Sequence, residues 1–389
     1  MIFAQDGYGP SEKIEDGIAS GYLDGVVFSI KHRNPDLLPH TISSTLSHHP
    51  EIDLFLDTHF YAAQMAMTRP GKIPDYSLFE TGLVRKDFSV KNISNYARRI
   101  IDYQHGLGLT NIILPSLTIA NFDGGNSYLS LQLYEAALDY MRETNIITQA
   151  KPYLSLAFHE AALHDDEKLS QYLDDVTLLE DVAGFYIVVE RNPGSSPQWQ
   201  DSRTLAKLMY IVSTLSDSYE VVCGFTDFPG LVLLAAGAKH VASGWFQTLR
   251  QYTGSYFMER GGMNNGKFRY ASKELLTQVL SEPDLQSIIR KGLSDKYIDP
   301  THGSDGLQDP NNLLFPQPAQ VLHQWKTFRD LGQRIQDASN PVDELEQLIT
   351  QAEANVTELQ GAGIVLDRDS IAHHAIWKQA INTFKDGVL

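Results

Sequence analysis

Side chains that can do acid–base or binding chemistry follow almost every short apolar run in this sequence of 389 residues. Where such runs are parallel strands of a barrel, the residues after each strand meet at one face and form the site. We therefore expect one shared site at the ends of the runs. Its candidate members are Asp6, Lys31, His32, Asp57, His59, Ser116, His159, Glu160, Glu190, Arg191, Asp227, Gln247 and Arg250.

Asp57 and His59 are the first candidates for catalysis, because side chains two residues apart share one face of an extended backbone. A metal site is an alternative, with His32, His59, His159 and a carboxylate as ligands. The His-x-His motif typical of metal-dependent barrel hydrolases is missing after the first run, where Asp6 is followed by Gly and Tyr. We therefore expect no metal and no cofactor.

Glu160 and Glu190 follow two successive apolar runs, and they are candidates for the acid/base pair of a glycosidase. The alternative is an ion-paired rim in which Arg191 or Lys31 holds Glu190. Asp227, after a later run, is a further candidate for catalysis by a barrel hydrolase.

The stretch Trp245-Phe246-Gln247, with Arg250 after it, has the residue types that stack on a planar ligand and read its edges. The alternative is structural, with Trp245 packed beneath the C-terminal part of the chain.

Eight short apolar runs that alternate with helical segments must position these side chains. The expected strands are residues 1–5, 25–30, 52–56, 111–114, 153–158, 184–189, 220–225 and 240–243. The expected helices are residues 12–20 with a Ser11 cap, a short helix after residue 32, and residues 94–103, 127–142, 169–179, 204–215 and 231–236. Eight units without a glycine-rich phosphate loop after the first strand predict a closed (β/α)₈ TIM barrel, not an open dinucleotide-binding sheet.

The strand pattern ends near residue 268, and helical periodicity replaces it at residues 274–280, 318–334, 342–359 and 371–384. The sequence thus predicts an α/β barrel over residues 1–255 and an α-helical C-terminal extension over residues 256–389.

Charge and composition narrow the classes of function. A formal net charge of −17 disfavours generic binding to nucleic acid. The one cysteine, Cys223, excludes a disulfide framework and multi-cysteine metal sites. No apolar run is long enough to cross a membrane and no signal peptide precedes the first strand, so we expect a cytoplasmic protein without membrane contact.

Four segments carry a resemblance to a known family. Residues 104–114, QHGLGLTNIIL, look like a Q-x-x-x-G-x-D-I-x-M entry into strand four, and residues 56–60, LDTHF, are similar in placement to a T-D-S-G-G-F-Q loop. Residues 183–190 match a strand that ends in glutamate, and residues 224–238 look like G-V-G-T-P-x-D-L-L…G. In this order and spacing, residues 50–245 resemble the tRNA-guanine transglycosylase family, whose barrels exchange guanine for a 7-deazaguanine base.

The resemblance implies that Asp57 contacts or handles the base and that Glu190 reads it. The second base-binding aspartate of the family falls at Ser116, and its nucleophilic aspartate falls at Ala242. The family's zinc ligands are absent. Without a carboxylate at position 242, ordinary tRNA base exchange has no nucleophile.

We therefore expect a divergent barrel that recognises a purine or 7-deazaguanine-type base, or a macromolecule carrying one. The resemblance also implies a role in a bacterial antiphage system. Two alternatives stay open: a metal-dependent or glycosidase-type barrel hydrolase using His59, His159, Glu160 and Asp227, and a catalytically silent binding subunit with a protein partner.

Overall fold

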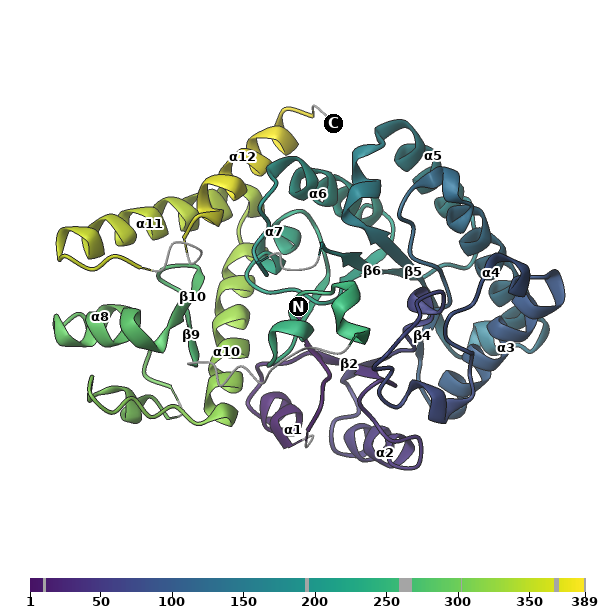
Figure 1. Cartoon of the computed structure of the whole chain (residues 1–389), viewed down its shortest axis with the longest axis horizontal. Coiled ribbons are helices and arrows are strands. Elements are labelled where there is room, and N and C mark those ends of the chain that lie inside the picture. The colour runs from purple at the N-terminus through teal and green to yellow at the C-terminus, as the bar shows by residue number, and fades with distance from the viewer. Residues whose placement is uncertain (10–11, 193–195, 259–267, 302, 367–370, 388–389) are drawn as a thin grey trace.

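The computed structural model describes residues 1–9, 12–192, 196–258, 268–301, 303–366 and 371–387. Eight parallel strands lie in the order β3-β2-β1-β8-β7-β6-β5-β4. They form a nearly closed barrel that helices surround, and an extension projects from one side (Figure 1). The fold is the (β/α)₈ TIM barrel that the alternation of runs predicts.

Strands and helices of the barrel alternate along the chain. The strands are β1 (Ile2–Gln5), β2 (Gly25–Ser29), β3 (Asp53–Asp57), β4 (Asn111–Leu114), β5 (Lys151–His159), β6 (Gly184–Glu190), β7 (Glu220–Cys223) and β8 (His240–Ser243). The helices are α1 (Glu12–Ala19), α2 (Leu38–His48), α3 (Val90–Gly106), α4 (Asn126–Glu143), α5 (Asp166–Thr177), α6 (Ser202–Ser216) and α7 (Gly230–Ala235). The predicted Ser11 cap lies outside the described residues.

Edge strands β3 and β4 meet at the seam of the barrel. At the start of these strands Asn111 Nδ2 donates to Asp53 Oδ1 across 3.2 Å. Beyond their ends the Thr118 amide donates to the Tyr61 carbonyl oxygen across 3.0 Å. Side-chain and loop hydrogen bonds thus close the barrel where the strand ladder stops, next to the segment that follows β3.

The extension contains a β-hairpin that the sequence pattern did not predict. Its elements are β9 (Arg269–Ser272), β10 (Thr277–Leu280), α8 (Gln286–Arg290), α9 (Ser294–Tyr297), α10 (Gln317–Gln336), α11 (Pro341–Gly361) and α12 (His373–Lys385). The helix expected over residues 274–280 is wrong, because β10 pairs with β9 in antiparallel fashion there. Leu275 and Leu276 point into two different apolar clusters, and Leu276 has a φ of 48°. An apolar spacing that suits a helix therefore also fits a hairpin turn with a core on each side.

Helix α10 packs along the barrel. Trp325 is fully buried, and its indole N–H donates to the Ser243 carbonyl oxygen across 2.9 Å. Apolar faces of α10, α11 and α12 belong to the barrel's own core, whereas the hairpin, α8 and α9 share a second core with the end of α11. The boundary at residue 255 stays a prediction.

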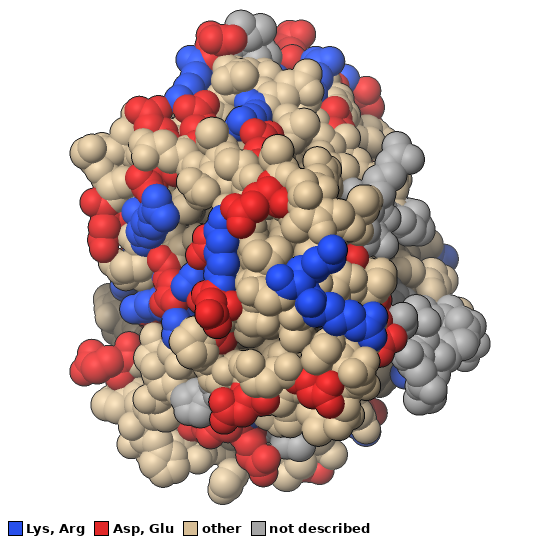
Figure 2. All heavy atoms as spheres, turned by 90° about the vertical axis from the view of Figure 1, so that its left-hand side faces the viewer, with Lys and Arg blue, Asp and Glu red and all other residues tan. Residues whose placement is uncertain are grey.

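The outer face of the extension carries charges of both signs, interleaved over its surface (Figure 2). Lys296 and Glu358 form one ion pair on the extension, and Arg334 and Glu344 form another, each at 2.5 Å. None of the helices in the described part of the chain combines the length and apolar character needed to cross a lipid bilayer.

Candidate functional site

Asp57 ends β3 and lies at the centre of the barrel mouth with 1% of its surface exposed. Its Oδ1 accepts the His59 amide at 2.7 Å, and its Oδ2 accepts the Tyr61 and Tyr186 hydroxyls at 2.9 and 3.2 Å. Burial raises the pKa of Asp57 to about 6, against the effect of these three donors. Asp57 is therefore a carboxyl group whose charge changes close to neutral pH.

His59 lies beside Asp57, as the two-residue spacing predicts, but by a different backbone route. Its φ is 54°, so a left-handed turn and not extended backbone places the two side chains together. His59 Nδ1 lies 2.8 Å from the Tyr61 hydroxyl and 3.3 Å from Asp57 Oδ2, and Nε2 lies 2.6 Å from Ser29 Oγ. Burial, and then the charge of Lys31, hold the pKa of His59 well below its usual value. The imidazole is therefore neutral at pH 7.

Aromatic rings from residues 252–257 cover this polar network. The His59 ring lies 5.8 Å from Tyr256 and 5.6 Å from Phe257, centroid to centroid. Tyr252 lies 5.4 Å from Tyr61, and its carbonyl oxygen accepts the Arg191 amide at 2.8 Å beyond the end of β6. This aromatic cap seals the centre of the barrel mouth from solvent.

An open pocket of about 690 Å³ lies over the aromatic cap. Lys31 Nζ lies 4.7 Å from the Tyr256 ring centroid and donates to the Arg69 carbonyl oxygen at 3.1 Å. His32 Nε2 lies 2.6 Å from the Tyr256 hydroxyl. Burial, and then the charge of Arg69, lower the pKa of Lys31 to about 8. The pocket is also lined by Tyr8, Phe246 and Lys72.

The charged side chains that line this pocket, which we call the Lys31 pocket, are all positive. Among its lining residues in the described part of the chain there are three cations and no carboxylate. Lys72 is paired at the surface with Asp75 at 3.3 Å. Lys31 and Arg69 therefore give the pocket a positive potential that favours an anion.

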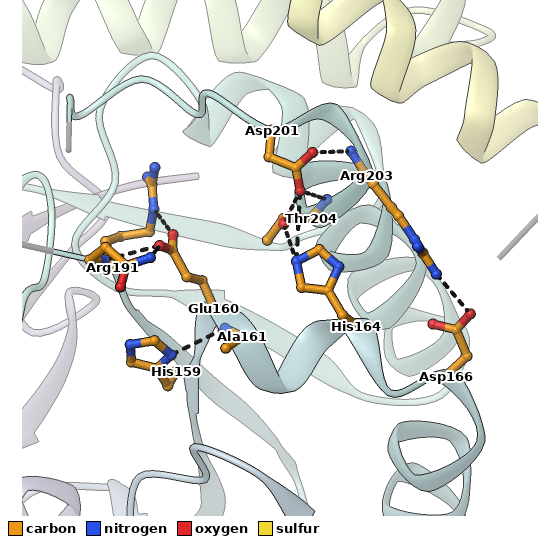
Figure 3. A network of polar contacts seen from close by, with 10 residues as sticks. His159, Glu160, Ala161, His164, Asp166, Arg191, Asp201, Arg203 and Thr204 are labelled. Carbon is orange, nitrogen blue, oxygen red and sulfur yellow. Dashed lines mark hydrogen bonds and ion pairs between the residues drawn. The ribbon is translucent and has the colours of Figure 1, made fainter.

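The sequence offered an ion-paired rim with Glu190 held by Arg191 or Lys31 as the alternative to a glycosidase pair, and Arg191 instead pairs with Glu160. Arg191 Nε donates to Glu160 Oε2 at 2.7 Å (Figure 3). The Arg191 guanidinium also lies 3.7 Å from the Trp199 ring centroid, so Arg191 pairs with Glu160 and not with Glu190. His159 accepts the Ala161 amide at 3.2 Å through Nδ1. Glu160 thus belongs to an ion-paired rim.

Glu190 faces the aromatic cap. A Cβ built on Gly254 would lie 2.9 Å from Glu190 Oε1, so the carboxyl group packs directly against the cap backbone. Burial raises the pKa of Glu190, and the nearby His159 opposes this. The Lys31 pocket does not include either Glu190 or Glu160 among its lining residues.

Asp6 and Asp227 are each held by an arginine. Asp6 is buried and binds Arg33 through Oδ2 at 2.8 Å and Oδ1 at 2.5 Å. Asp227 Oδ2 lies 3.5 Å from Arg250, which also donates to Gln324 at 3.2 Å. These carboxylates are parts of ion pairs at other places on the mouth.

Trp245, Gln247 and Ser116 lie away from the central network. Trp245 is 8% exposed, contacts Trp325 at 6.3 Å between ring centroids and donates to the Tyr8 carbonyl oxygen at 3.3 Å, so it packs against the extension. Gln247 is exposed and lines a separate groove between the segment after β8, the β9–β10 hairpin and α10. Ser116 is buried.

Sequence reasoning missed Ser29, Tyr61, Tyr186, Tyr256 and Arg69, which complete the network and the pocket. Alternation along β2 and β6 points Ser29 and Tyr186 inward, a signal that an unbroken apolar run conceals. Within the described residues, no three His, Cys, Asp or Glu side chains form a group that could hold a metal ion, so His32, His59 and His159 do not make one.

No protein-family model matches the chain, and no curated protein matches it. The transglycosylase resemblance therefore stays a prediction. Among solved structures, the chain is similar to dihydrodipicolinate synthase from Acinetobacter baumannii, with 12% identity and a TM-score of 0.34 over 94% of this chain and 98% of that one. It is also similar to a dihydrodipicolinate synthase from Bacillus anthracis, with 11% identity and a TM-score of 0.32 over 98% and 97%.

Proposed function

We propose that the Lys31 pocket binds a small planar molecule that carries an anionic group. The observation that carries this proposal is the position of the Lys31 ammonium, held on the Tyr256 ring face in a pocket without a lining carboxylate among the described residues. A phosphate or carboxylate replaces the missing counter-ion there, and the exposed rings of Tyr8 and Phe246 suit a flat heterocycle.

A purine or 7-deazaguanine-type base is the planar part that the family resemblance implies. In this proposal Asp57 does not contact the base, because Tyr256 and Phe257 lie between the buried network and the pocket. Asp57 instead positions His59. A protein partner, a base-carrying macromolecule and a role in antiphage defence remain predictions from the resemblance.

Isothermal titration of the purified chain tests the proposal, with guanosine 5′-monophosphate, guanosine, 7-deazaguanine and inorganic phosphate as probes. We expect the monophosphate to bind, and Lys31→Met to weaken it at least tenfold, since a charge-assisted hydrogen bond to phosphate is lost. Lys13→Met is the matched control, because Lys13 lies 5.0 Å from the Trp245 ring and outside the pocket.

Two results would overturn the proposal: no binding of the monophosphate, or equal binding by wild type and Lys31→Met. If inorganic phosphate binds as tightly as the monophosphate, the anion site stands and the planar part of the proposal is wrong.

A further inference from the structure

The strongest arrangement not used by the proposed function is a buried hydroxyl–imidazole pair at the ends of β2 and β3. Ser29 Oγ lies 2.6 Å from His59 Nε2, and both side chains are fully buried. Ser29 is the register partner of Asp57, which places the serine and the carboxylate on neighbouring strands. The Lys31 amide donates to Ser29 Oγ at 3.2 Å, and the Tyr256 hydroxyl is a further hydrogen-bond partner of Ser29.

The hydrogen bonds of Tyr61 fix which nitrogen of His59 carries the proton. Tyr61 has one hydroxyl proton, and it donates this proton to Asp57 Oδ2 at 2.9 Å. His59 Nδ1, 2.8 Å from the Tyr61 oxygen, must then be the donor in that contact. A neutral imidazole has one N–H, so His59 Nε2 is left as a proton acceptor facing Ser29.

We propose that Ser29 is a nucleophile for acyl transfer, with His59 as its general base and with Asp57 and Tyr61 as positioning residues. Nucleophile, base and orienting group lie within the distances that serve this chemistry in unrelated folds. The left-handed backbone of His59 is a conformation that the surrounding structure must hold, which is common at functional sites.

The reaction uses an ester or thioester and water. Ser29 Oγ forms a bond to the carbonyl carbon while its proton passes to His59 Nε2. The bond to the alcohol or thiol breaks, and this leaving group takes the proton from His59. Water then gives a proton to His59 while its oxygen bonds to the acyl carbon. The bond between that carbon and Ser29 Oγ breaks, the acid is released, and Ser29 Oγ takes the proton back from His59.

Tyr256 governs access to Ser29. Its ring lines the Lys31 pocket and also contacts the His59 ring, so a substrate reaches the serine when Tyr256 moves aside. The natural substrate class rests on the proposed function: an ester or thioester with an anionic group held by Lys31. The nucleophilic role of Ser29 itself does not depend on that group.

Labelling with an ethoxy fluorophosphonate, followed by peptide mass spectrometry, tests the nucleophile. This probe is uncharged and has no planar group, so its reaction does not require the Lys31 pocket to bind a ligand. We expect phosphonylated Ser29 in wild type, at least tenfold faster labelling in Tyr256→Ala, and none at this site in His59→Gln. Absence of labelled Ser29 from both wild type and Tyr256→Ala would overturn the proposal.

A Ser29→Cys variant, which changes the size of the side chain little, gives a second measurement of how strongly His59 activates this position. With Tyr256→Ala added to both variants to open the aromatic cap, we expect the Ser29→Cys thiol to react with iodoacetamide at pH 7 at least tenfold faster than the thiol of Ser255→Cys, a control position that lines the pocket. Adding His59→Gln should abolish the difference, because a free thiol has a pKa of about 8.5. Equal rates for the two introduced thiols would contradict an activating imidazole.

The two proposals fail separately. If guanosine monophosphate does not bind and Ser29 is still labelled, only the proposed ligand is wrong. If the monophosphate binds and Ser29 is labelled in neither protein, only the nucleophile is wrong.

Discussion

Replacing Asp57 by asparagine should change how the stability of the barrel depends on pH. Burial moves the pKa of this carboxyl group from 3.8 to about 6 in the folded state. Since one pKa unit is worth about 1.4 kcal/mol, the charged form is disfavoured by about 3 kcal/mol on folding. The folded chain therefore holds the Asp57 proton to a higher pH than the unfolded chain does, and Asp57 makes stability fall as pH rises.

Most of this effect of Asp57 on the free energy of unfolding falls between pH 4 and pH 7. Of these 3 kcal/mol, about 2 kcal/mol should be lost between pH 4 and pH 7, where the unfolded carboxyl is largely charged and the folded one is still titrating. His59 contributes with the opposite sign, because its lowered pKa costs stability as the pH falls below its usual value. Asp57→Asn retains His59, so the difference in unfolding free energy between wild type and variant isolates the aspartate.

Urea denaturation at half-unit steps from pH 4 to pH 7 measures this difference. We expect the stability of wild type relative to Asp57→Asn to fall steadily over the range. Ser116→Ala is the control, since it alters a buried position at the end of β4 without removing a carboxyl group. Parallel curves for wild type and Asp57→Asn, or an increase with pH, would refute the assignment of a raised pKa to Asp57.

Three further changes test the packing around the site. Arg191→Met should cost about 2 kcal/mol in urea denaturation, because the half-buried Glu160 loses its charged partner but keeps Asn192 as a hydrogen-bond donor, whereas Arg142→Met at an exposed pair should cost under about 1 kcal/mol. Trp325→Ala should cost about 4 kcal/mol and expose α10 to limited proteolysis, while Trp325→Phe retains most of the protection. Asp201→Ala should cost about 1 kcal/mol, because the Asp201 side chain caps α6 by accepting the Arg203 and Thr204 amides, and unchanged thermal unfolding would argue against that cap.

The strands of the barrel could be predicted because each one is marked by the apolar residues of its own short segment. A run such as residues 184–189 is apolar throughout, and this is sufficient to identify a strand buried on both faces. The hairpin at β9 and β10 could not be predicted in the same way. Leu275 and Leu276 enter different cores, and only the packing of α10 and α11 decides between a hairpin and a helix there.

In the candidate site, too, local residue patterns could be predicted and contacts between distant segments could not. Residue type and position after a strand identified Asp57, His59 and Lys31, and the structure brings them to the barrel mouth. Their partners come from distant segments: Tyr256 is 197 residues from His59 in the sequence, and it contributes a ring contact that no local pattern encodes. The choice of Glu160 over Glu190 as the partner of Arg191 depends on side-chain directions at two adjacent strand ends.

The packing of α10 against the barrel limits how early the chain can complete its fold during synthesis. Ile2 of β1 lies against Gly332 of α10, and β1 pairs with β8 on the side away from β2, so the first strand gains its second strand neighbour and its covering helix more than 200 residues later. A ribosome adding about 5–20 residues per second completes that interval in some tens of seconds at the slower rate. Until then, the edge of β1 that β8 covers and the apolar faces of β1 and α7 remain without their final partners. A nascent chain arrested before α10 should therefore bind chaperones, and release of the remaining residues should end that binding.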